Sequence, residues 1–198
     1  MTFRKEIKFK ISNSDLKILK INLINSGMTF LYPKRKVLSC YFDTKNLDLF
    51  YQSEEGILPR KKVRYRWYGD NNLINQEIKI SSIEGRYKVS TKFNQNKHYL
   101  FNYHRFKDDC NGILSPLLMI SYQREYFLIK NLRLTIDTEI KYASVKKNFK
   151  RNVLDYENVI EIKTDSDNAE FVIEKFLQLR QSRFSKYCRG INILNKLL

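Results

Sequence analysis

The stretch that decides the fold is Arg60–Tyr68, which reads RKKVRYRWY. Successive side chains of a β-strand point to opposite faces of the sheet, so residues two apart share a face. One face of this stretch therefore carries a continuous basic row, and the other carries Val63, Tyr65 and Trp67. A basic row repels itself unless an anion lies against it. The stretch indicates a strand that is apolar on one side and suited to an anion on the other.

The tripeptide Glu-Ile-Lys occurs four times, beginning at residues 6, 77, 139 and 161. In a strand, each copy places a carboxylate next to an ammonium group, with the isoleucine on the opposite face. Such charged faces have two interpretations: the solvated outer side of an antiparallel sheet, which is the commoner arrangement, or the lining of a tunnel. Carboxylates interleaved with basic residues suit a tunnel, because basic groups bind phosphate and carboxylates bind Mg²⁺ or Mn²⁺.

Alternation of apolar and polar residues predicts about eight strands, mostly antiparallel, which can close into a barrel. The expected strands cover residues 3–11, 36–43, 60–68, 73–82, 86–93, 119–129, 132–141 and 158–164. Helices are expected after the Asn13-Ser14-Asp15 cap, over about 97–109, over 168–179, and in a tail after a break near 182–186. We expect a chain break at Gly112 and Pro116, a tight turn at Lys130-Asn131, and a basic loop over 142–156.

Composition limits the classes of protein. With 198 residues the chain is expected to form a single domain, 1–198, and its net charge of +16 predicts a polyanionic partner: nucleic acid, an anionic membrane or a polyphosphate compound. No apolar run is long enough to span a membrane, and the N-terminus does not read as a signal peptide. The three cysteines have no metal-binding spacing, which favours a reducing cytoplasm.

Eight short motifs occur in an order that resembles the VTC domain, the catalytic domain of the vacuolar transporter chaperone polyphosphate polymerases. They are Arg4-x-Glu6-x-Lys8, Tyr41-Phe42-Asp43-Thr44, Lys62-x-Arg64-x-Arg66-Trp67-Tyr68-Gly69, Glu77-Ile78-Lys79, Tyr122-x-Arg124, Arg133-x-Thr135-x-Asp137-Thr138, Glu161-Ile162-Lys163 and Ser185-Lys186-Tyr187. That domain belongs to the triphosphate tunnel metalloenzymes (the CYTH-like superfamily). The resemblance covers nearly the whole chain. It implies an α+β fold in which an eight-stranded, mostly antiparallel β-barrel forms a tunnel, with helices flanking it at the N- and C-terminal ends.

The resemblance also implies the activity: transfer of the γ-phosphoryl group of ATP to a growing polyphosphate chain, with Mn²⁺ or Mg²⁺ as cofactor. The residues that it places on phosphate are Lys8, Lys62, Arg64, Arg66, Lys79, Lys88, Arg124, Arg133 and Lys186, with Lys62 and Lys88 carried over less directly. Those expected to act in catalysis are Arg64, Arg66, Lys79, Arg124, Arg133 and Lys186. Glu161 is expected to be the principal metal ligand, with Glu6, Glu77 and Asp137 as further candidates. The copy at Glu139–Lys141 matches no motif and is interpreted as a strand end.

Alternatives to the polymerase stay open. Arg4 stands where the cyclase and thiamine triphosphatase branch has its first glutamate, which favours the polymerase-like branch over a plain hydrolase. An inorganic or nucleoside triphosphatase of the same fold, and a non-catalytic module that binds polyphosphate or nucleic acid, are the other candidates. Carboxylates on the basic faces would repel a nucleic-acid backbone, so the expected partners are ATP and polyphosphate. We also leave open a membrane-protein partner that would hold the chain at the inner face of a membrane.

Overall fold

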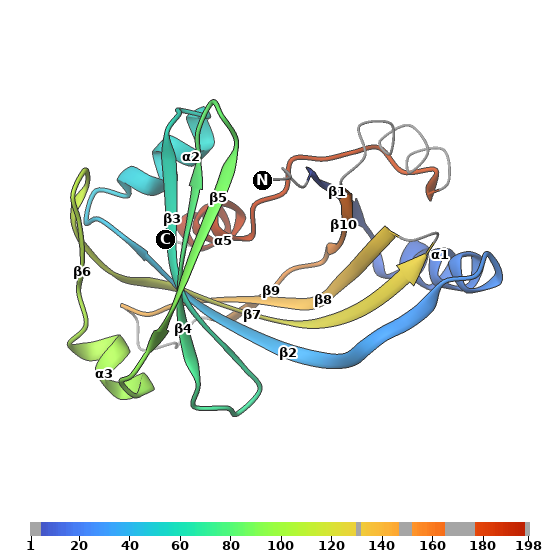
Figure 1. The fold of residues 1–198 in the computed structure, drawn as a ribbon, viewed down its shortest axis with the longest axis horizontal. Coiled ribbons are helices and arrows are strands. Elements are labelled where there is room, and N and C mark those ends of the chain that lie inside the picture. The colour runs from blue at the N-terminus through green and yellow to red at the C-terminus, as the bar shows by residue number, and fades with distance from the viewer. Residues whose placement is uncertain (1–4, 130–131, 147–151, 165–176, 197–198) are drawn as a thin grey trace. The chain divides into compact units, whose positions relative to one another are not determined.

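The computed structural model of the chain describes residues 5–129, 132–146, 152–164 and 177–196. Within these ranges the strands are β1 (Lys5–Ile11), β2 (Thr29–Asp43), β3 (Arg60–Tyr68), β4 (Ile74–Ser81), β5 (Arg86–Phe93), β6 (Phe106–Asp108), β7 (Gly112–Ile129), β8 (Leu132–Ser144), β9 (Asn152–Leu154) and β10 (Asn158–Thr164). The helices are α1 (Asn13–Asn25), α2 (Asp48–Glu55), α3 (Lys97–Asn102) and α5 (Lys186–Asn195) (Figure 1). No helix among the described residues is long and apolar enough to cross a membrane.

Hydrogen bonds join the strands into one sheet in the order β1-β10-β8-β7-β2-β3-β4-β5, while the short strands β6 and β9 pair with β7 and β8. The pairs β1–β10, β10–β8, β2–β3, β3–β4, β4–β5 and β6–β7 are antiparallel. The expected α+β fold with eight main antiparallel strands is therefore confirmed. In the described part of the chain the strand order ends at β1 and β5, and hydrogen bonds do not close the sheet.

Contacts divide the chain into two compact units. The first unit consists of residues 1–36, 122–140 and 154–184, and the second consists of residues 37–121, 141–153 and 185–198. The long strands β2, β7 and β8 each contribute residues to both units.

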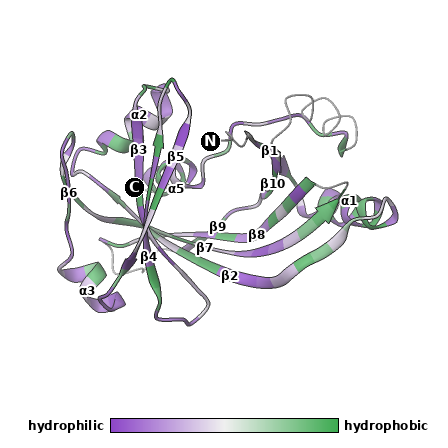
Figure 2. Cartoon of the chain, viewed as in Figure 1, coloured by the Kyte–Doolittle hydropathy of each residue, from purple (hydrophilic) through white to green (hydrophobic). Residues whose placement is uncertain are grey.

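The first unit has its apolar core between α1 and the isoleucine-rich strands. The Ser12 side chain caps α1 by accepting a hydrogen bond from the backbone of Asp15 at 3.2 Å, which fixes where the helix begins. Leu16 and Leu23 of α1 are buried in one cluster with the apolar faces of β1, β8 and β10. Hydrophilic and hydrophobic residues alternate along β8 (Figure 2), so only one face of that strand joins this core.

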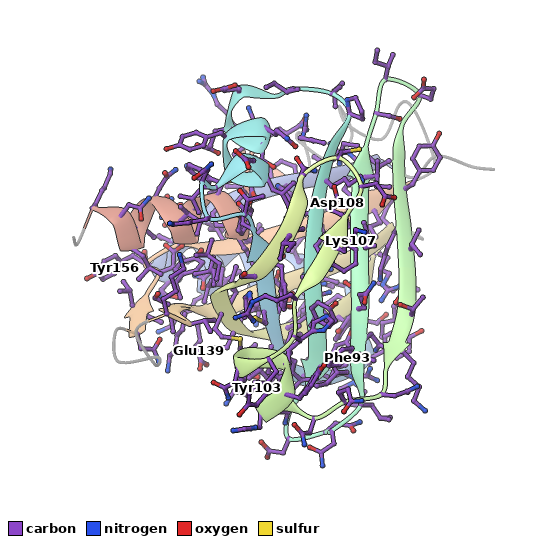
Figure 3. The ribbon with its side chains drawn as sticks, turned by 90° about the vertical axis from the view of Figure 1, so that its left-hand side faces the viewer. Phe93, Tyr103, Lys107, Asp108, Glu139 and Tyr156 are labelled. Atoms are coloured by element: carbon purple, nitrogen blue, oxygen red, sulfur yellow. The ribbon has the colours of Figure 1, made fainter. Side chains whose placement is uncertain are left out.

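The second unit has a core of aromatic and aliphatic side chains from β2, β3 and β7. Phe42, Val63 and Tyr65 are each at most 1% exposed, and Leu100 of α3 joins the same cluster. Lys61 reaches out of this face and donates to Asp108 of β6 at 2.8 Å. Asp108 is labelled beside Lys107 on that strand in Figure 3. The apolar side of the β3 stretch thus packs as its sequence predicts.

Several expected boundaries were wrong. The predicted break at Gly112 and Pro116 is instead the start of β7, because alternate residues remain buried through Pro116 and carry the strand period past it. The helix expected over 97–109 ends at Asn102 and gives way to β6, and the loop expected over 142–156 contains the end of β8 and all of β9. The strand expected from residue 36 begins at Thr29.

Helix α2 was not predicted. The side chain of Asp43, at the end of the preceding strand, accepts hydrogen bonds from the backbone amides of Leu49 and Phe50 at 3.0 Å each. The amide of Asp48, the first residue of α2, donates to the Thr44 hydroxyl at 3.1 Å. The signals for this helix are therefore the Asp43-Thr44 pair that precedes it. Arg4, the Lys130-Asn131 turn and most of the helix expected over 168–179 lie outside the described residues.

Candidate anion-binding site

Strand β3 is buried on both of its faces. Val63, Tyr65 and Trp67 are at most 3% exposed on the apolar face, and Arg64 and Arg66 are each only 8% exposed on the other. A solvated outer face would leave arginine side chains in water, because burying a charge without compensation is costly. In the second unit, therefore, the charged face of β3 is an interior face, and the interpretation as a solvated outer side is wrong there.

Three lysines lie side by side across the neighbouring strands β3, β4 and β5. Lys62 is opposite Lys79, and Lys79 is opposite Lys88. Like charges directly opposite one another destabilise a sheet. A row of this kind is stable when an anion lies against it, so the arrangement indicates an anion-binding surface. We call the following residues of the second unit the β3 cluster: Lys62, Arg64, Arg66, Glu77, Lys79 and Lys88.

Glu77 holds the two arginines of the β3 cluster in place. Its Oε2 accepts from Arg64 Nε at 2.6 Å, lies 2.5 Å from Arg64 Nη2, and lies 3.8 Å from Arg66 Nη1. The other oxygen, Oε1, accepts from Lys88 at 2.6 Å. Arg64 Nη1 also donates to the hydroxyl of Tyr41 at 2.9 Å. A guanidinium bound along two of its edges is fixed in orientation, so its remaining N–H groups point in fixed directions toward an oxyanion.

The charge of Glu77 follows from these contacts. Burial opposes its ionisation, but Arg64, Arg66 and Lys88 outweigh burial and lower the pKa of the Glu77 carboxyl from 4.5 to about 2. The carboxylate is thus ionised at neutral pH. One carboxylate among the five basic side chains of the β3 cluster leaves a marked excess of positive charge, which suits a polyanion rather than a single carboxylate ligand.

Tyr41 links the arginines to helices α2 and α5 of the second unit. Its ring stacks on Tyr187 of α5, with ring centroids 5.1 Å apart. The Tyr187 hydroxyl donates to Asp43, the same carboxylate that receives the first backbone amides of α2. This buried chain of contacts fixes the wall of the β3 cluster. We did not predict Tyr41 as a site residue, because its contact with Arg64 depends on the strand register.

Tyr41 is also unusual in its acidity. Burial opposes ionisation of the Tyr41 hydroxyl, but the positive charges of Arg64, Arg66 and Lys79 lower its pKa from 10.0 to about 7. A tyrosine that ionises near neutrality would add a second negative charge beside Arg64. The positive potential of the β3 cluster is therefore strong enough to change the charge of a neighbouring phenol.

The start of α5 lies against β3. Ser185 caps α5 by accepting from the backbone of Cys188 at 3.3 Å, and its hydroxyl also receives the Lys62 ammonium at 2.9 Å. Lys186, predicted to bind phosphate, is the first residue of α5 and is half-buried. The structure thus brings the predicted Lys62 and the Ser185-Lys186 pair to the same end of the second unit.

In the first unit, two Glu-Ile-Lys copies pair with each other in antiparallel register. Glu6 is opposite Lys163 and Lys8 is opposite Glu161, with the two isoleucines opposite one another. The Lys163 ammonium lies 3.3 Å from Glu6 Oε1 and 3.6 Å from Glu161 Oε1, and the Lys8 ammonium lies 3.9 Å from Glu161 Oε2. All three distances are longer than the 2.5–2.6 Å at which Arg64 and Lys88 hold Glu77, so these carboxylates are held more loosely.

Arg124 and Asp137 form a tight pair on the next two strands of the first unit. The guanidinium donates to both carboxylate oxygens of Asp137, at 2.6 and 2.7 Å, and Asp137 is fully buried. Burial opposes the charge of Arg124, but Tyr122 and Asp137 raise its pKa above the ordinary value. We call the following residues of the first unit the β10 cluster: Glu6, Lys8, Arg124, Asp137, Glu161 and Lys163.

Arg133 differs from the other predicted phosphate-binding residues. It lies on the same face of β8 as Asp137, but near the end of the strand, where its side chain is exposed. Its guanidinium carbon lies 5.8 Å from the ring centroid of Tyr32 and 5.7 Å from that of Tyr126. Arg133 is thus placed on aromatic rings rather than beside a carboxylate.

The carboxylates differ in how well they suit a divalent cation. Among the described residues, no three His, Cys, Asp or Glu side chains gather as a metal site. Mg²⁺ in phosphate-transfer sites, however, commonly uses one or two carboxylates and takes its other ligands from substrate phosphates. Glu6 and Glu161 fit this role, because Oε1 of each lies within 3.6 Å of the same positive group, the Lys163 ammonium. One cation can therefore be reached by both carboxylates. Glu77 and Asp137 are each held by a guanidinium at 2.5–2.7 Å and fit the role of orienting arginine.

The two histidines lie away from the β3 cluster. His104 Nε2 is 2.5 Å from the hydroxyl of Tyr65, on the apolar face of β3, and burial lowers its pKa. His98 lies on α3 beside Tyr103. No histidine is therefore placed to act as a general base on the basic face of the second unit.

Comparisons with known proteins identify the family and the fold. The sequence profile of the VTC domain matches residues 3–111 and 109–195. No curated protein matches the sequence significantly. Solved structures of similar fold include a candidate adenylate cyclase from Vibrio parahaemolyticus, with a TM-score of 0.60 at 12% identity, covering 96% of this chain and 98% of that chain. HpAC1 from Hippeastrum is described as a candidate adenylyl cyclase with a dominant triphosphatase activity. It has a TM-score of 0.59 at 16% identity, and the match covers 95% of this chain and 96% of that chain. The PH1819 protein from Pyrococcus horikoshii has a TM-score of 0.60 at 14% identity, and the match covers 98% of this chain and 99% of that chain.

Proposed function

Because the chain belongs to the VTC domain family, we propose that it binds the triphosphate of ATP and transfers the terminal phosphoryl group to a polyphosphate chain. The observation that carries the proposal is the basic face shared by β3, β4 and β5, where the buried Arg64 and Arg66 and three lysines have the single carboxylate of Glu77 among them. A face of this charge is stable when phosphate oxygens neutralise it. In this proposal residues 1–198 act as one polyphosphate polymerase domain.

Each cluster contributes its own cations to phosphate binding. In the β3 cluster, Arg64 and Arg66 are oriented by Glu77, and Lys62, Lys79 and Lys88 supply point charges for further phosphate oxygens. In the β10 cluster, Lys8 and Arg124 bind phosphate while Asp137 fixes the guanidinium. Phosphoryl transfer depends mainly on positioning and on neutralising the equatorial oxygens. Fixed guanidinium groups supply both.

Glu161 and Glu6 would hold a divalent cation. A bound Mg²⁺ or Mn²⁺ supplies Lewis-acid neutralisation of phosphate oxygens. In the chain itself, Lys163 lies between the two carboxylates and balances their charge at 3.3 and 3.6 Å. A cation held by these two carboxylates would take over the charge balance that Lys163 supplies in the chain itself.

The acceptor explains the absence of a general base from the β3 cluster. The terminal oxygen of a phosphate chain is already anionic near neutral pH, so its attack on the γ-phosphorus of ATP needs no proton acceptor. The bond to the γ-phosphorus forms as the bond to the bridging oxygen of ADP breaks, and ADP leaves as an anion. A hydrolase would have to activate water instead.

The test is product analysis. Purified protein is incubated with ATP and Mn²⁺, and ADP, inorganic phosphate and polyphosphate are each quantified. ADP together with polymer supports the polymerase. The variant Arg64→Lys keeps the charge but loses the two-sided hold by Glu77 and Tyr41, and we expect a strong loss of turnover. Arg105→Ala, an exposed arginine of the second unit, is the matched control and should have wild-type activity.

A triphosphatase is the second candidate. It is supported by the triphosphatase activity described for the Hippeastrum protein of the same fold. The same incubation distinguishes the two, because a triphosphatase releases inorganic phosphate or pyrophosphate and forms no polymer. No turnover, combined with unchanged tripolyphosphate affinity in Arg64→Ala, would refute both candidates.

A further inference from the structure

A group of arginine and tyrosine side chains lies in the first unit at the exposed end of β8. Arg133 contacts the rings of Tyr32 and Tyr126 at 5.8 and 5.7 Å, and Arg35 lies 5.9 Å from the ring centroid of Tyr126. The two tyrosine rings meet edge to face, with centroids 5.8 Å apart and an interplanar angle of 83°. We call these four residues the arginine–tyrosine cluster.

The arginine–tyrosine cluster carries positive charge that is open to solvent. Arg35 and Arg133 approach the same ring of Tyr126, and neither forms an ion pair within the part of the chain that the structure describes. Arg133 is exposed, and Tyr32 is 47% exposed. The Arg133 guanidinium and the Tyr32 ring are therefore both accessible to a ligand. The two arginines place their positive charges beside the Tyr126 ring, which meets the Tyr32 ring edge to face.

Strand geometry places this surface next to the phosphate-binding residues of the same unit. Tyr126 and Arg124 are two residues apart on β7 and share a face, about 7 Å apart along the strand. Arg133 and Asp137 are four residues apart on β8, about 13 Å along the strand. A ligand that bound Arg124 through a phosphate could reach the exposed end of the face with its other end.

We propose that the arginine–tyrosine cluster is a stacking site for the nucleobase of a nucleoside triphosphate. Inorganic polyphosphate would gain nothing from the two rings, whereas a base stacks on tyrosine rings and on guanidinium planes. The remaining positive charge suits the phosphates attached to that base. This inference rests on the proposed binding of a triphosphate, and it adds a basis for preferring ATP over an inorganic chain.

The test compares two ligands that share a triphosphate and differ in the base. Calorimetric titrations of ATP and of tripolyphosphate are made without divalent cation, so that no turnover occurs. For Tyr32→Leu we expect the Kd of ATP to rise about five- to tenfold, since stacking on one aromatic side chain contributes that order of affinity, while the Kd of tripolyphosphate stays unchanged. Tyr32→Phe keeps the ring and should bind ATP like the wild type.

Tyr156→Leu is the matched control, because Tyr156 also belongs to the first unit, is 86% exposed (Figure 3) and makes none of the contacts that define the arginine–tyrosine cluster. Equal effects of Tyr32→Leu on both ligands, or no effect on either, would overturn the stacking site while triphosphate binding, and with it the proposed function, stood. If the wild type bound neither ligand, both the stacking site and the proposed function would fail. Loss of ATP binding in Tyr32→Phe would also overturn the proposal, since the ring would be retained.

Discussion

Replacing Glu77 by glutamine should reveal how strongly the β3 cluster depends on one negative charge. Glu77 is 4% exposed and is bound by Arg64, Arg66 and Lys88. Its pKa falls from 4.5 to about 2 in the folded protein, and this difference corresponds to about 3 kcal/mol of stability at neutral pH. Glutamine keeps the shape of the side chain and removes the charge, so we expect Glu77→Gln to lower the free energy of unfolding by about 3 kcal/mol at pH 7.

The assay is urea denaturation followed by the fluorescence of Trp67, the single tryptophan, which is 3% exposed. For a chain of this size the loss corresponds to a fall in Tm of about 6–12 °C. The sign of the pH dependence follows from the lowered pKa. The stability contributed by Glu77 is present above pH 4.5 and is lost as the pH falls toward 2, so the difference between wild type and variant should shrink over that range.

Two further measurements make the reasoning refutable. Glu55→Gln, an exposed glutamate of α2 in the same unit, should have wild-type stability. Saturating tripolyphosphate should restore a large part of the stability lost in Glu77→Gln, because the anion supplies the missing negative charge. If Glu77→Gln were as stable as the wild type at pH 7, the view of Glu77 as the counter-charge of buried arginines would be wrong.

Replacing Glu161 by glutamine should raise the Mn²⁺ concentration needed for half-maximal turnover by more than about tenfold, while the loose ion pairs of Glu161 predict little change in stability; an unchanged metal titration would contradict its role. Tyr41→Phe should remove a tyrosinate absorbance step near pH 7, because the wild-type pKa is about 7. Since ionised Tyr41 is favoured in the folded state, the stability advantage of wild type over Tyr41→Phe should grow as the pH rises from 7 toward 10, and a flat difference would argue against ionisation. A thiol reagent should modify exposed Cys110 rapidly and buried Cys40 and Cys188 slowly, because burial raises the pKa of both buried thiols; three fast thiols in the native protein would contradict the packing.

The alternation of apolar and polar residues predicted most of the strands well, because side chains of a strand repeat on one face every two residues. The bounds expected for Arg60–Tyr68, Arg86–Phe93 and Asn158–Thr164 match β3, β5 and β10. Helix α2 was missed because the amides of Leu49 and Phe50 in its first turn bond to Asp43 in the preceding strand. The extension of β7 through Pro116 was missed because a proline was taken as a break.

The sequence predicted which residue types form the site, but not which of them are buried and which are exposed. An alternating pattern is the same whether its charged face meets solvent or lies inside, so the burial of Arg64 comes only from the folded structure. The resemblance to the VTC domain placed Arg133 with the other phosphate-binding arginines, yet its position near a strand end leaves it exposed. Contacts such as Arg64 with Tyr41 depend on strand register, which no single sequence fixes.

The pairing of the two Glu-Ile-Lys copies has a consequence for how the chain reaches this fold. Lys8 of β1 and Glu161 of β10 are neighbours in the sheet but lie far apart in the sequence. During synthesis at about 5–20 residues per second, β1 would wait roughly 8–30 s for its partner strand to be made. Until then its buried Ile7 and Phe9 would face water, and closing so long a loop makes this a slow, late step of folding. Newly made protein should therefore depend on protection of the β1 segment until translation has passed β10.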